Sequence, residues 1–192
     1  MAMNYFHRIL CRSAMWERTS ATKIVSWALS GLELGSSVLE IGPGYGANVR
    51  ALLGRTSALT GVEIDTALVE RLRDRHGDLM TVVEGDGAEM PLPDLEFDTV
   101  VCFTMLHHVP TVRQQDALFA EAFRVVRPGG VFAGSDGLDT RVFRLMHLGD
   151  TCLPIPPEEA AERLARVGFA DIEIDTGAAS FRFRAKRPGT HR

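Results

Sequence analysis

The sequence predicts an α/β protein built on a doubly wound, mainly parallel sheet, and three observations carry that prediction. Short apolar runs rich in β-branched residues alternate with segments of helical periodicity between residues 38 and 134. A glycine-rich turn directly follows the first apolar run. Two stretches of apolar–polar alternation, at residues 171–175 and 181–186, predict a final antiparallel hairpin. Strands separated by helices imply parallel pairing through right-handed crossovers.

The expected elements follow one another in a regular order. Residues 4–30 are predicted to form one or two helices, ended by Gly31 and Gly35. The first strand begins at Val38, and further strands are predicted at 58–64, 79–84, 99–103 and 131–134. Predicted helices span residues 48–53, 66–76 and 114–126, and a last helix begins at Pro157 and stops at Gly168.

Length and composition predict a single domain that spans residues 1–192. Apolar residues make up 45% and charged residues 24% of the chain, as in globular proteins. A net charge of −4 argues against a nucleic-acid partner. No signal-peptide core and no run of about 20 apolar residues is visible. We therefore expect a cytoplasmic protein without a membrane span, with monomer and homodimer both open.

The cysteines do not predict a metal site. The chain has three cysteines, an odd number, at positions Cys11, Cys102 and Cys152. They are far apart and show no paired spacing, which indicates free thiols in a reducing compartment. Near the end of the fifth predicted strand only Asp136 offers a carboxylate, whereas a metal site there would need several clustered acids or amides. The expectation is that no metal is bound.

The glycine turn predicts a ligand site. Gly42, Gly44 and Gly46 lie between the first strand and a helix, which places backbone N–H groups at the carboxyl end of a parallel strand. Without side chains, Gly42 and Gly44 let a ligand lie against the backbone. A tight turn with no ligand is the alternative, and three nearby acids weigh against it.

These acids lie in or at the ends of three predicted strands. Glu63 lies 19 positions after Gly44, where a carboxylate accepts the hydroxyl hydrogens of a ribose. Asp86 ends the third strand, where a carboxylate accepts from the exocyclic amine of an adenine. Glu40 lies inside the first strand, where a buried carboxylate needs a partner such as a ligand ammonium group.

The motifs around these acids carry a family resemblance. Residues 40–46 (Glu-Ile-Gly-Pro-Gly-Tyr-Gly), 59–65, 84–87, 97–101 and 126–130 resemble the successive motifs of class I S-adenosylmethionine-dependent methyltransferases. Residues 106–109 (Leu-His-His-Val) are similar to the segment after strand four in the small-molecule branch. The resemblance implies a seven-stranded, Rossmann-like sheet of order 3-2-1-4-5-7-6 with strand seven antiparallel. It also implies S-adenosylmethionine as the cofactor.

The resemblance assigns parts of the cofactor to parts of the chain. The glycine turn faces the methionine part, Glu63 the ribose, Asp86 and Gly87 the adenine, and residues 103–106 the sulfonium region. The predicted cofactor-binding residues are Glu40, Gly42, Pro43, Gly44, Glu63, Ile64, Gly85, Asp86, Gly87, Ala88, Phe103, Thr104 and Leu106.

The acceptor side is predicted from what remains. His107 and His108 follow the fourth strand, near the expected methyl group, and either is a candidate general base. Each has a structural alternative, which is to cap a helix or to pack beneath the cofactor. Asp136 is a candidate to orient a histidine or to take the proton, with an ordinary loop aspartate as the alternative.

Two variable segments, 1–36 and 137–157, are expected to cover a small, largely apolar acceptor. Leu138, Val142, Leu145 and Met146 share a helical face, interpreted either as core or as a lid. Tyr5, Phe6 and Trp16 are candidate walls of the acceptor site. The sequence does not decide between O-, N- and C-methylation. An NAD(P)-dependent oxidoreductase and a non-catalytic cofactor-binding subunit are the alternative functions.

Overall fold

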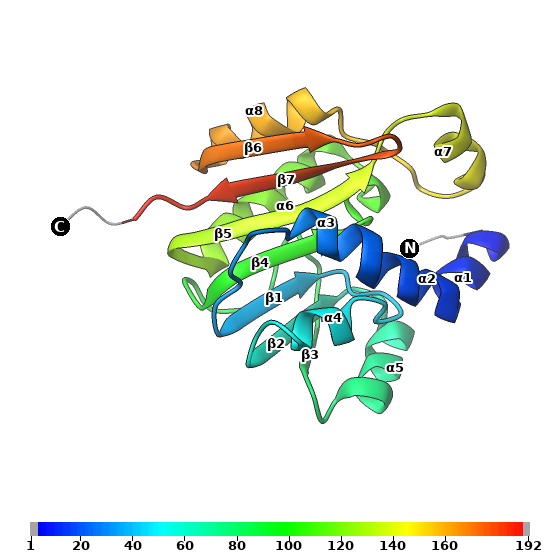
Figure 1. Ribbon diagram of the computed structural model, residues 1–192, viewed down its shortest axis with the longest axis horizontal. Helices are drawn as coiled ribbons and strands as arrows, with labels where there is room; N and C mark the ends of the chain where they lie inside the picture. The colour runs from blue at the N-terminus through cyan, green and yellow to red at the C-terminus, as the bar shows by residue number, and fades with distance from the viewer. Residues whose placement is uncertain (1–3, 190–192) are drawn as a thin grey trace.

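The computed structural model describes residues 4–189 and contains one seven-stranded sheet of order β3-β2-β1-β4-β5-β7-β6 (Figure 1). Strands β1 to β5 pair in parallel, and β7 runs antiparallel to both β5 and β6. This confirms the predicted fold class and strand order. The strands are β1 (Ser37–Ile41), β2 (Ala58–Glu63), β3 (Thr81–Glu84), β4 (Phe97–Phe103), β5 (Val126–Gly137), β6 (Ala170–Thr176) and β7 (Ser180–Lys186).

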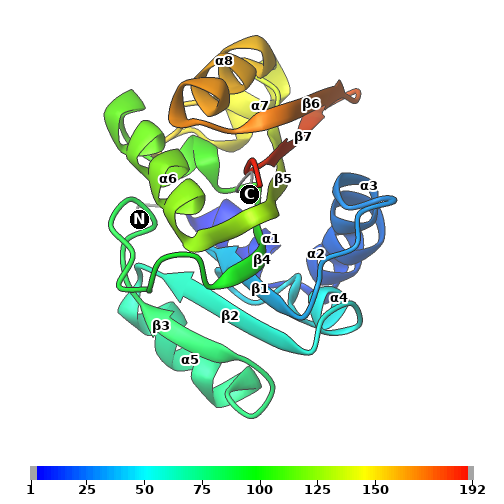
Figure 2. The ribbon, with the colours of Figure 1, turned by 90° about the vertical axis from the view of Figure 1, so that its left-hand side faces the viewer.

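Helices cover both faces of the sheet (Figure 2). The shorter elements near the site are the 3-10 turn η2 (Leu106–His108) and α7 (Arg141–Met146). One face packs against α6 (Val112–Val125) and α8 (Pro157–Val167), and the other against α3 (Ser26–Ala28), α4 (Val49–Leu53) and α5 (Thr66–His76). Among residues 4–189, no helix combines the length and apolarity required to cross a bilayer.

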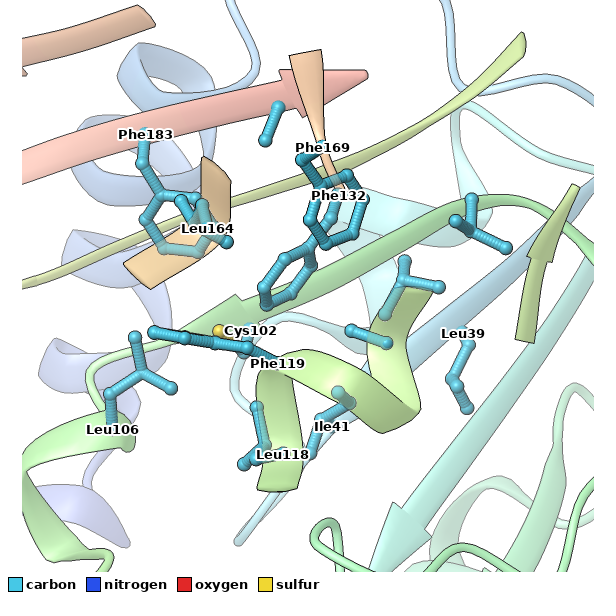
Figure 3. Packing of buried hydrophobic residues seen from close by; sticks show 14 of the residues in the cluster. Leu39, Ile41, Cys102, Leu106, Leu118, Phe119, Phe132, Leu164, Phe169 and Phe183 are labelled. Atoms are coloured by element: carbon cyan, nitrogen blue, oxygen red, sulfur yellow. The ribbon is translucent and has the colours of Figure 1, made fainter. Parts of the chain in front are cut away.

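The core between β4, β5 and α6 combines aromatic with aliphatic side chains (Figure 3). The Phe132 ring packs edge-on against Phe119 at 6.0 Å and Phe183 at 4.9 Å between ring centroids. Edge-to-face pairs of this kind add to the free energy gained by burial. Cys102 lies in the same cluster, fully buried, and is a small core residue with a free thiol. The rigid sheet therefore fixes the ends of β1, β2 and β4, where the site forms.

The N-terminal helices lie across the sheet near the glycine turn. The chain forms α1 (Tyr5–Cys11), α2 (Ala14–Thr19), a π-helical stretch η1 (Ser20–Val25) and α3. Arg182 on β7 donates to the Trp27 carbonyl oxygen at 2.6 Å and pairs with Asp175 on β6. Arg184, also on β7, donates to the Ala28 and Ser30 carbonyl oxygens. The end of the N-terminal helical segment is thus fastened to the hairpin.

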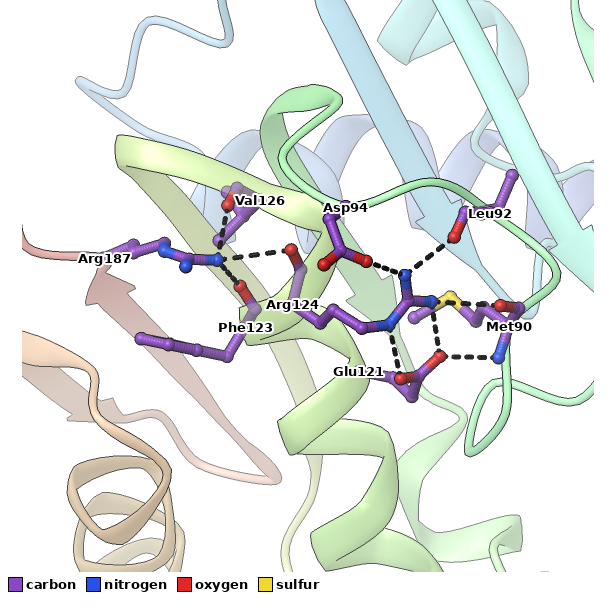
Figure 4. A network of polar contacts seen from close by, with 8 residues as sticks. All are labelled: Met90, Leu92, Asp94, Glu121, Phe123, Arg124, Val126 and Arg187. Carbon is purple, nitrogen blue, oxygen red and sulfur yellow. Dashed lines mark hydrogen bonds and ion pairs between the residues drawn. The ribbon is translucent and has the colours of Figure 1, made fainter.

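Strand β5 starts five residues earlier than predicted. Val126 pairs with Phe97 and Val131 with Thr99, so the intervening residues form an irregularity in the strand pair. Gly129 accommodates the bend with φ +82°. Arg124 and Arg187 hold this region by donating to the carbonyl oxygens of Met90, Leu92, Phe123 and Val126 (Figure 4). Gly129 N–H donates to the Arg187 carbonyl oxygen and Arg187 N–H to the Gly130 carbonyl oxygen, both at 2.9 Å, so the bent segment stays bonded to the chain after β7.

Candidate functional site

Two adjoining cavities lie at the carboxyl ends of the parallel strands. Their volumes are about 230 Å³ and about 320 Å³. Four residues line both cavities: Gly42, Glu63, Met105 and His108. Small-molecule sites usually enclose about 300–1,000 Å³, so the two cavities together have the size of one extended site. A ligand bound across the shared residues would reach from one cavity into the other.

The first cavity brings together the predicted residues that follow β2 and β3. Its wall includes Glu63, Ile64, Gly85, Asp86, Gly87 and Ala88. Asp86 Oδ1 accepts the Ala88 N–H at 2.8 Å, which fixes the loop after β3. Leu118 and Val109 line the same cavity and supply apolar surface. One polar wall and one apolar wall suit a flat, partly polar ring system.

Glu63 is buried at the junction of the cavities and already accepts three backbone N–H groups. Oε2 accepts from Gly44 at 3.0 Å, and Oε1 from Ile64 at 3.0 Å and Asp65 at 3.1 Å. Burial raises the pKa of Glu63, while these hydrogen bonds lower it. Two carboxylate oxygens offer about four lone-pair sites, so capacity remains for a ligand hydroxyl. Glu63 therefore also stabilises the glycine turn.

The second cavity is lined by the glycine turn itself. Gly44 has φ +57°, a conformation that favours glycine, and a Cβ there would meet no atom within 4 Å. The backbone at Gly44 is therefore open to a ligand. At Gly42 a Cβ would approach Met105 Cε to 3.1 Å, so this glycine allows Met105 to sit against the turn. Pro43, Tyr45 and Ala47 line the same cavity.

Glu40 lies beneath this turn in a buried polar chain. Asn48 Nδ2 donates to Glu40 Oε1 at 2.7 Å, and Ser20 Oγ donates to Asn48 Oδ1 at 2.6 Å. Ser20 and Asn48 line the second cavity, whereas Glu40 does not. Glu40 Oε2 is buried and has no hydrogen-bond partner among the described residues. Burial raises the pKa of Glu40 to about 7, and Glu63 adds to the shift.

The raised pKa of Glu40 predicts a pH-dependent stability. The folded protein binds this proton more tightly than the unfolded chain, whose carboxyl pKa is about 4.5. Ionisation of Glu40 therefore does not reduce the free energy of unfolding below pH 4.5, where the carboxyl is protonated in both states. The reduction grows as the pH rises and is complete above pH 7. Relative to Glu40→Gln, the wild-type protein is expected to lose on the order of 3 kcal/mol of unfolding free energy across that window. Urea unfolding of both proteins at pH 4.5 to 8 measures it, and parallel profiles would contradict the prediction.

His107 and Asp136 form a buried pair next to the second cavity. Asp136 is fully buried inside β5, so the interpretation as a loop aspartate is wrong. Its Oδ1 accepts from His107 Nδ1 at 2.5 Å and from the Gly137 N–H at 2.8 Å. Its Oδ2 accepts from the His107 backbone N–H at 2.8 Å. His107 Nε2 is buried and has no partner among the described residues.

Two further histidines adjoin this pair. His108 Nδ1 lies 3.0 Å from the Thr151 carbonyl oxygen, and His147 Nδ1 lies 2.8 Å from the Phe143 carbonyl oxygen. The ring centroid of His107 lies 4.1 Å from that of His108 and 4.8 Å from that of His147. All three imidazoles line the second cavity. The sequence predicted two of them, and the chain path after β5 adds the third.

The end of β4 supplies the remaining predicted residues. Phe103 and Thr104 line the second cavity. Thr104 has φ +50°, an unusual conformation for a β-branched residue, and such outliers often mark functional sites. The structure does not bring Leu106 to the cavities: η2 directs it into the core, where it is fully buried. Met105 occupies the place expected for Leu106.

The helical face in segment 137–157 was interpreted either as core or as a lid, and the structure bears on the first of these. Val142 and Leu145 are 68% and 67% exposed and Met146 is exposed too, so the core interpretation is wrong for these three residues, whereas Leu138 packs against the core. Phe143 faces inward instead, with its ring centroid 4.2 Å from that of His147. Trp16 and Met146 line the second cavity, whereas the side chains of Tyr5 and Phe6 lie outside the described part of the chain. No periodicity in the sequence distinguished Phe143 from its neighbours.

The fold is that of the class I methyltransferases. The methyltransferase domain family matches residues 39–134, which is half of the chain. The protein belongs to this family, and S-adenosylmethionine is its cofactor. This confirms the resemblance of the motifs and excludes the alternative of an NAD(P)-dependent oxidoreductase.

Related proteins match part of their length only. A Mycolicibacterium smegmatis protein described as a probable S-adenosylmethionine-dependent methyltransferase is 40% identical over 100 residues, which cover 51% of this chain and 37% of the relative. A sterol 24-C-methyltransferase of Gibberella zeae is 31% identical over 119 residues, covering 59% and 30%. The chain thus spans roughly a third of these relatives.

A solved structure shows the same fold over nearly the whole chain. Phosphoethanolamine N-methyltransferase 2 of Haemonchus contortus, in complex with S-adenosylmethionine, superposes with a TM-score of 0.70. The match covers 95% of this chain and 60% of that structure, at 16% sequence identity. At this identity the comparison supports the fold alone.

Proposed function

We propose that this enzyme methylates a small, largely apolar acceptor that binds in the second cavity. The observation that carries the proposal is the junction at Gly42, Glu63, Met105 and His108, where the two cavities meet. The second cavity is lined by the apolar side chains Leu10, Trp16, Ile24, Phe103, Phe143 and Met146. A sterol acceptor in one relative is consistent with such a lining.

The residues present fit the cofactor. Glu63 retains acceptor capacity for ribose hydroxyls, and Asp86 lies in the wall where an adenine amine would be bound. The open backbone at Gly44 would carry the methionine part. The orphaned Glu40 Oε2 would balance an ammonium group, directly or through water. When bound, the sulfonium supplies a methyl group already activated for transfer.

The chain's own contribution is alignment, exclusion of water and removal of a proton. Met105 at the junction and Thr104 in the wall of the second cavity would align the acceptor with the donor. Where the acceptor carries a hydroxyl or amine, His107 Nε2 would take its proton, since Asp136 holds the proton of the ring at Nδ1. His108 would then position the acceptor. In this proposal His107 is the general base and His108 positions the acceptor.

The two variable segments form the proposed cover of a single-domain enzyme spanning residues 1–192. Asn4 Nδ2 donates to the Met146 and Leu148 carbonyl oxygens, which joins the N-terminal segment to α7. Leu153 N–H donates to the His107 carbonyl oxygen at 2.7 Å and anchors the far end of segment 137–157. We infer that the part before this anchor moves, with Gly149 at φ +84° as a hinge.

Limited proteolysis tests the moving cover. Trypsin is expected to cleave at Arg141 and Arg144 in α7 before any site in the sheet, because a short helix with exposed apolar residues opens at low free-energy cost. S-adenosylhomocysteine is expected to slow this cleavage several-fold. If α7 is cut no faster than the sheet, the cavity is preformed.

Calorimetry followed by an acceptor screen tests the function. We expect micromolar binding of S-adenosylmethionine and S-adenosylhomocysteine and no binding of NADH. The screen then supplies sterols, fatty acids, phenols and amines with methyl-labelled cofactor, and labelled apolar product is the expected result. Transfer confined to highly charged acceptors would contradict the proposed acceptor class.

A further inference from the structure

We propose that His107, His108 and His147 bind one divalent transition-metal ion in the wall of the second cavity. One ring nitrogen from each histidine lies within 4.8 Å of one from each of the others. Metal–nitrogen bonds of about 2.0–2.1 Å in tetrahedral geometry place ligand nitrogens about 3.4 Å apart. Coordination therefore requires small rotations of the imidazole rings that bring these nitrogens closer together.

The hydrogen bonds at Nδ1 prepare all three imidazoles as ligands. Each Nδ1 faces an oxygen: Asp136 Oδ1 for His107, the Thr151 carbonyl for His108 and the Phe143 carbonyl for His147. An oxygen at this distance holds the proton on Nδ1 and leaves the lone pair on Nε2. Metal-binding histidines almost always carry such an outer hydrogen bond, and a carboxylate partner raises the basicity of the ring. We assign Nε2 as the coordinating atom in each case.

Burial and chemistry define the class of ion. The three side chains are buried, and Phe143 packs against both His107 and His147, which limits their rotamers. Three neutral nitrogen ligands favour zinc, iron, cobalt, nickel or copper over magnesium and calcium, which prefer oxygen. Three protein ligands also leave at least one coordination position for another group. No spacing in the sequence predicts this site, because His147 lies 39 residues after His108.

The catalytic role proposed for the ion rests on the proposed function. Binding of the ion to the three histidines does not depend on that function. An acceptor oxygen in the remaining position would lose its proton to solvent more readily, because a bound cation lowers the pKa of a coordinated hydroxyl. In that state Nε2 of His107 is a ligand, so coordination replaces His107 as the means of ionising the acceptor. Methyl transfer to the resulting oxygen anion then needs no further base.

Cobalt titration tests the site without an acceptor. The full chain is purified without a polyhistidine tag, stripped with a chelator and titrated with Co²⁺. We expect one Co²⁺ per chain, visible d–d absorption, and loss of that absorption when Zn²⁺ is added. Asp136→Asn is expected to weaken binding about 10–100-fold, as for other outer-shell partners. His147→Ala is expected to weaken it further.

A matched control and a parallel measurement keep the result decisive. His76→Gln replaces another buried histidine outside the cluster and should leave Co²⁺ binding unchanged. Circular dichroism verifies each fold, and His147→Gln replaces any His147→Ala protein that does not fold. Wild-type protein that binds S-adenosylhomocysteine but no Co²⁺ overturns the metal proposal alone. Protein that binds Co²⁺ but not S-adenosylhomocysteine supports the metal proposal and overturns the proposed function. Equal Co²⁺ affinity in the His147 and His76 variants also overturns the metal site.

Discussion

Asp136→Ala is expected to lower the free energy of unfolding by about 3–5 kcal/mol, the usual result of removing one partner from a buried pair. The carboxylate is fully buried and accepts the His107 backbone N–H, the His107 ring and the Gly137 N–H. Alanine leaves all three donors without an acceptor, and an unsatisfied buried donor costs about 1–3 kcal/mol. Urea unfolding followed by circular dichroism measures the change.

Asp139→Ala is the matched control for this experiment. Asp139 lies three residues further on, is partly exposed and pairs with Arg144 on the surface. Exposed pairs contribute about 0–1 kcal/mol, so this variant should unfold close to the wild-type protein. If the two variants differ by less than about 1 kcal/mol, Asp136 does not organise the site.

Asp136→Asn separates orientation from packing. The amide keeps the volume of the carboxylate but brings an NH₂ group against the N–H groups of His107 or Gly137. We expect the His107 proton to move to Nε2, which removes the lone pair facing the cavity. Long-range ¹H–¹⁵N NMR spectra distinguish the two tautomers directly. An unchanged His107 tautomer in a folded Asn variant would show that Asp136 does not set it.

The sheet and one side of the site were predictable because local patterns determine both. Alternating strands and helices fix which residues end β1, β2 and β3, and the carboxyl ends of parallel strands meet at one edge. Glu63 and Asp86 therefore came together from sequence alone. Leu106 lines neither cavity, because a single 3-10 turn directs it into the core, and Met105 lies at the junction.

The acceptor side was harder to predict because it depends on the path of a segment without periodicity. His147 and Phe143 reach His107 only through the loop after β5, and no residue spacing specifies that approach. The exposed apolar residues of α7 resemble a core-facing stripe in the sequence. Tertiary contacts, such as Leu153 N–H to the His107 carbonyl oxygen, decide which face turns inward.

Glu63→Ala is expected to weaken S-adenosylhomocysteine binding by about 1.5–3 kcal/mol, or roughly 10–150-fold in Kd, the scale of hydrogen bonds to a charged group. Isothermal titration calorimetry measures the affinity. The structure adds a second effect, because Glu63 also accepts the N–H groups of Gly44, Ile64 and Asp65. The variant should therefore also be less stable, and the affinity must be measured where it is fully folded.

Two further variants show whether Glu63→Ala binds S-adenosylhomocysteine more weakly because a ligand contact is lost or because the glycine turn changes shape. Glu63→Gln keeps one oxygen that can accept from the backbone but has no charge, so a loss smaller than that of alanine is expected. Glu84→Ala removes an acid at the end of the neighbouring strand β3, which accepts from Thr66 and lines neither cavity. Its Kd should stay within about twofold of the wild-type value, because it removes no contact to the cavities. If folded Glu63→Ala and Glu84→Ala bind equally well, the ribose is held by other residues. A large loss in Glu63→Ala that Glu63→Gln fully recovers would assign the effect to the Gly44 turn, since the amide restores its acceptor but not the charge.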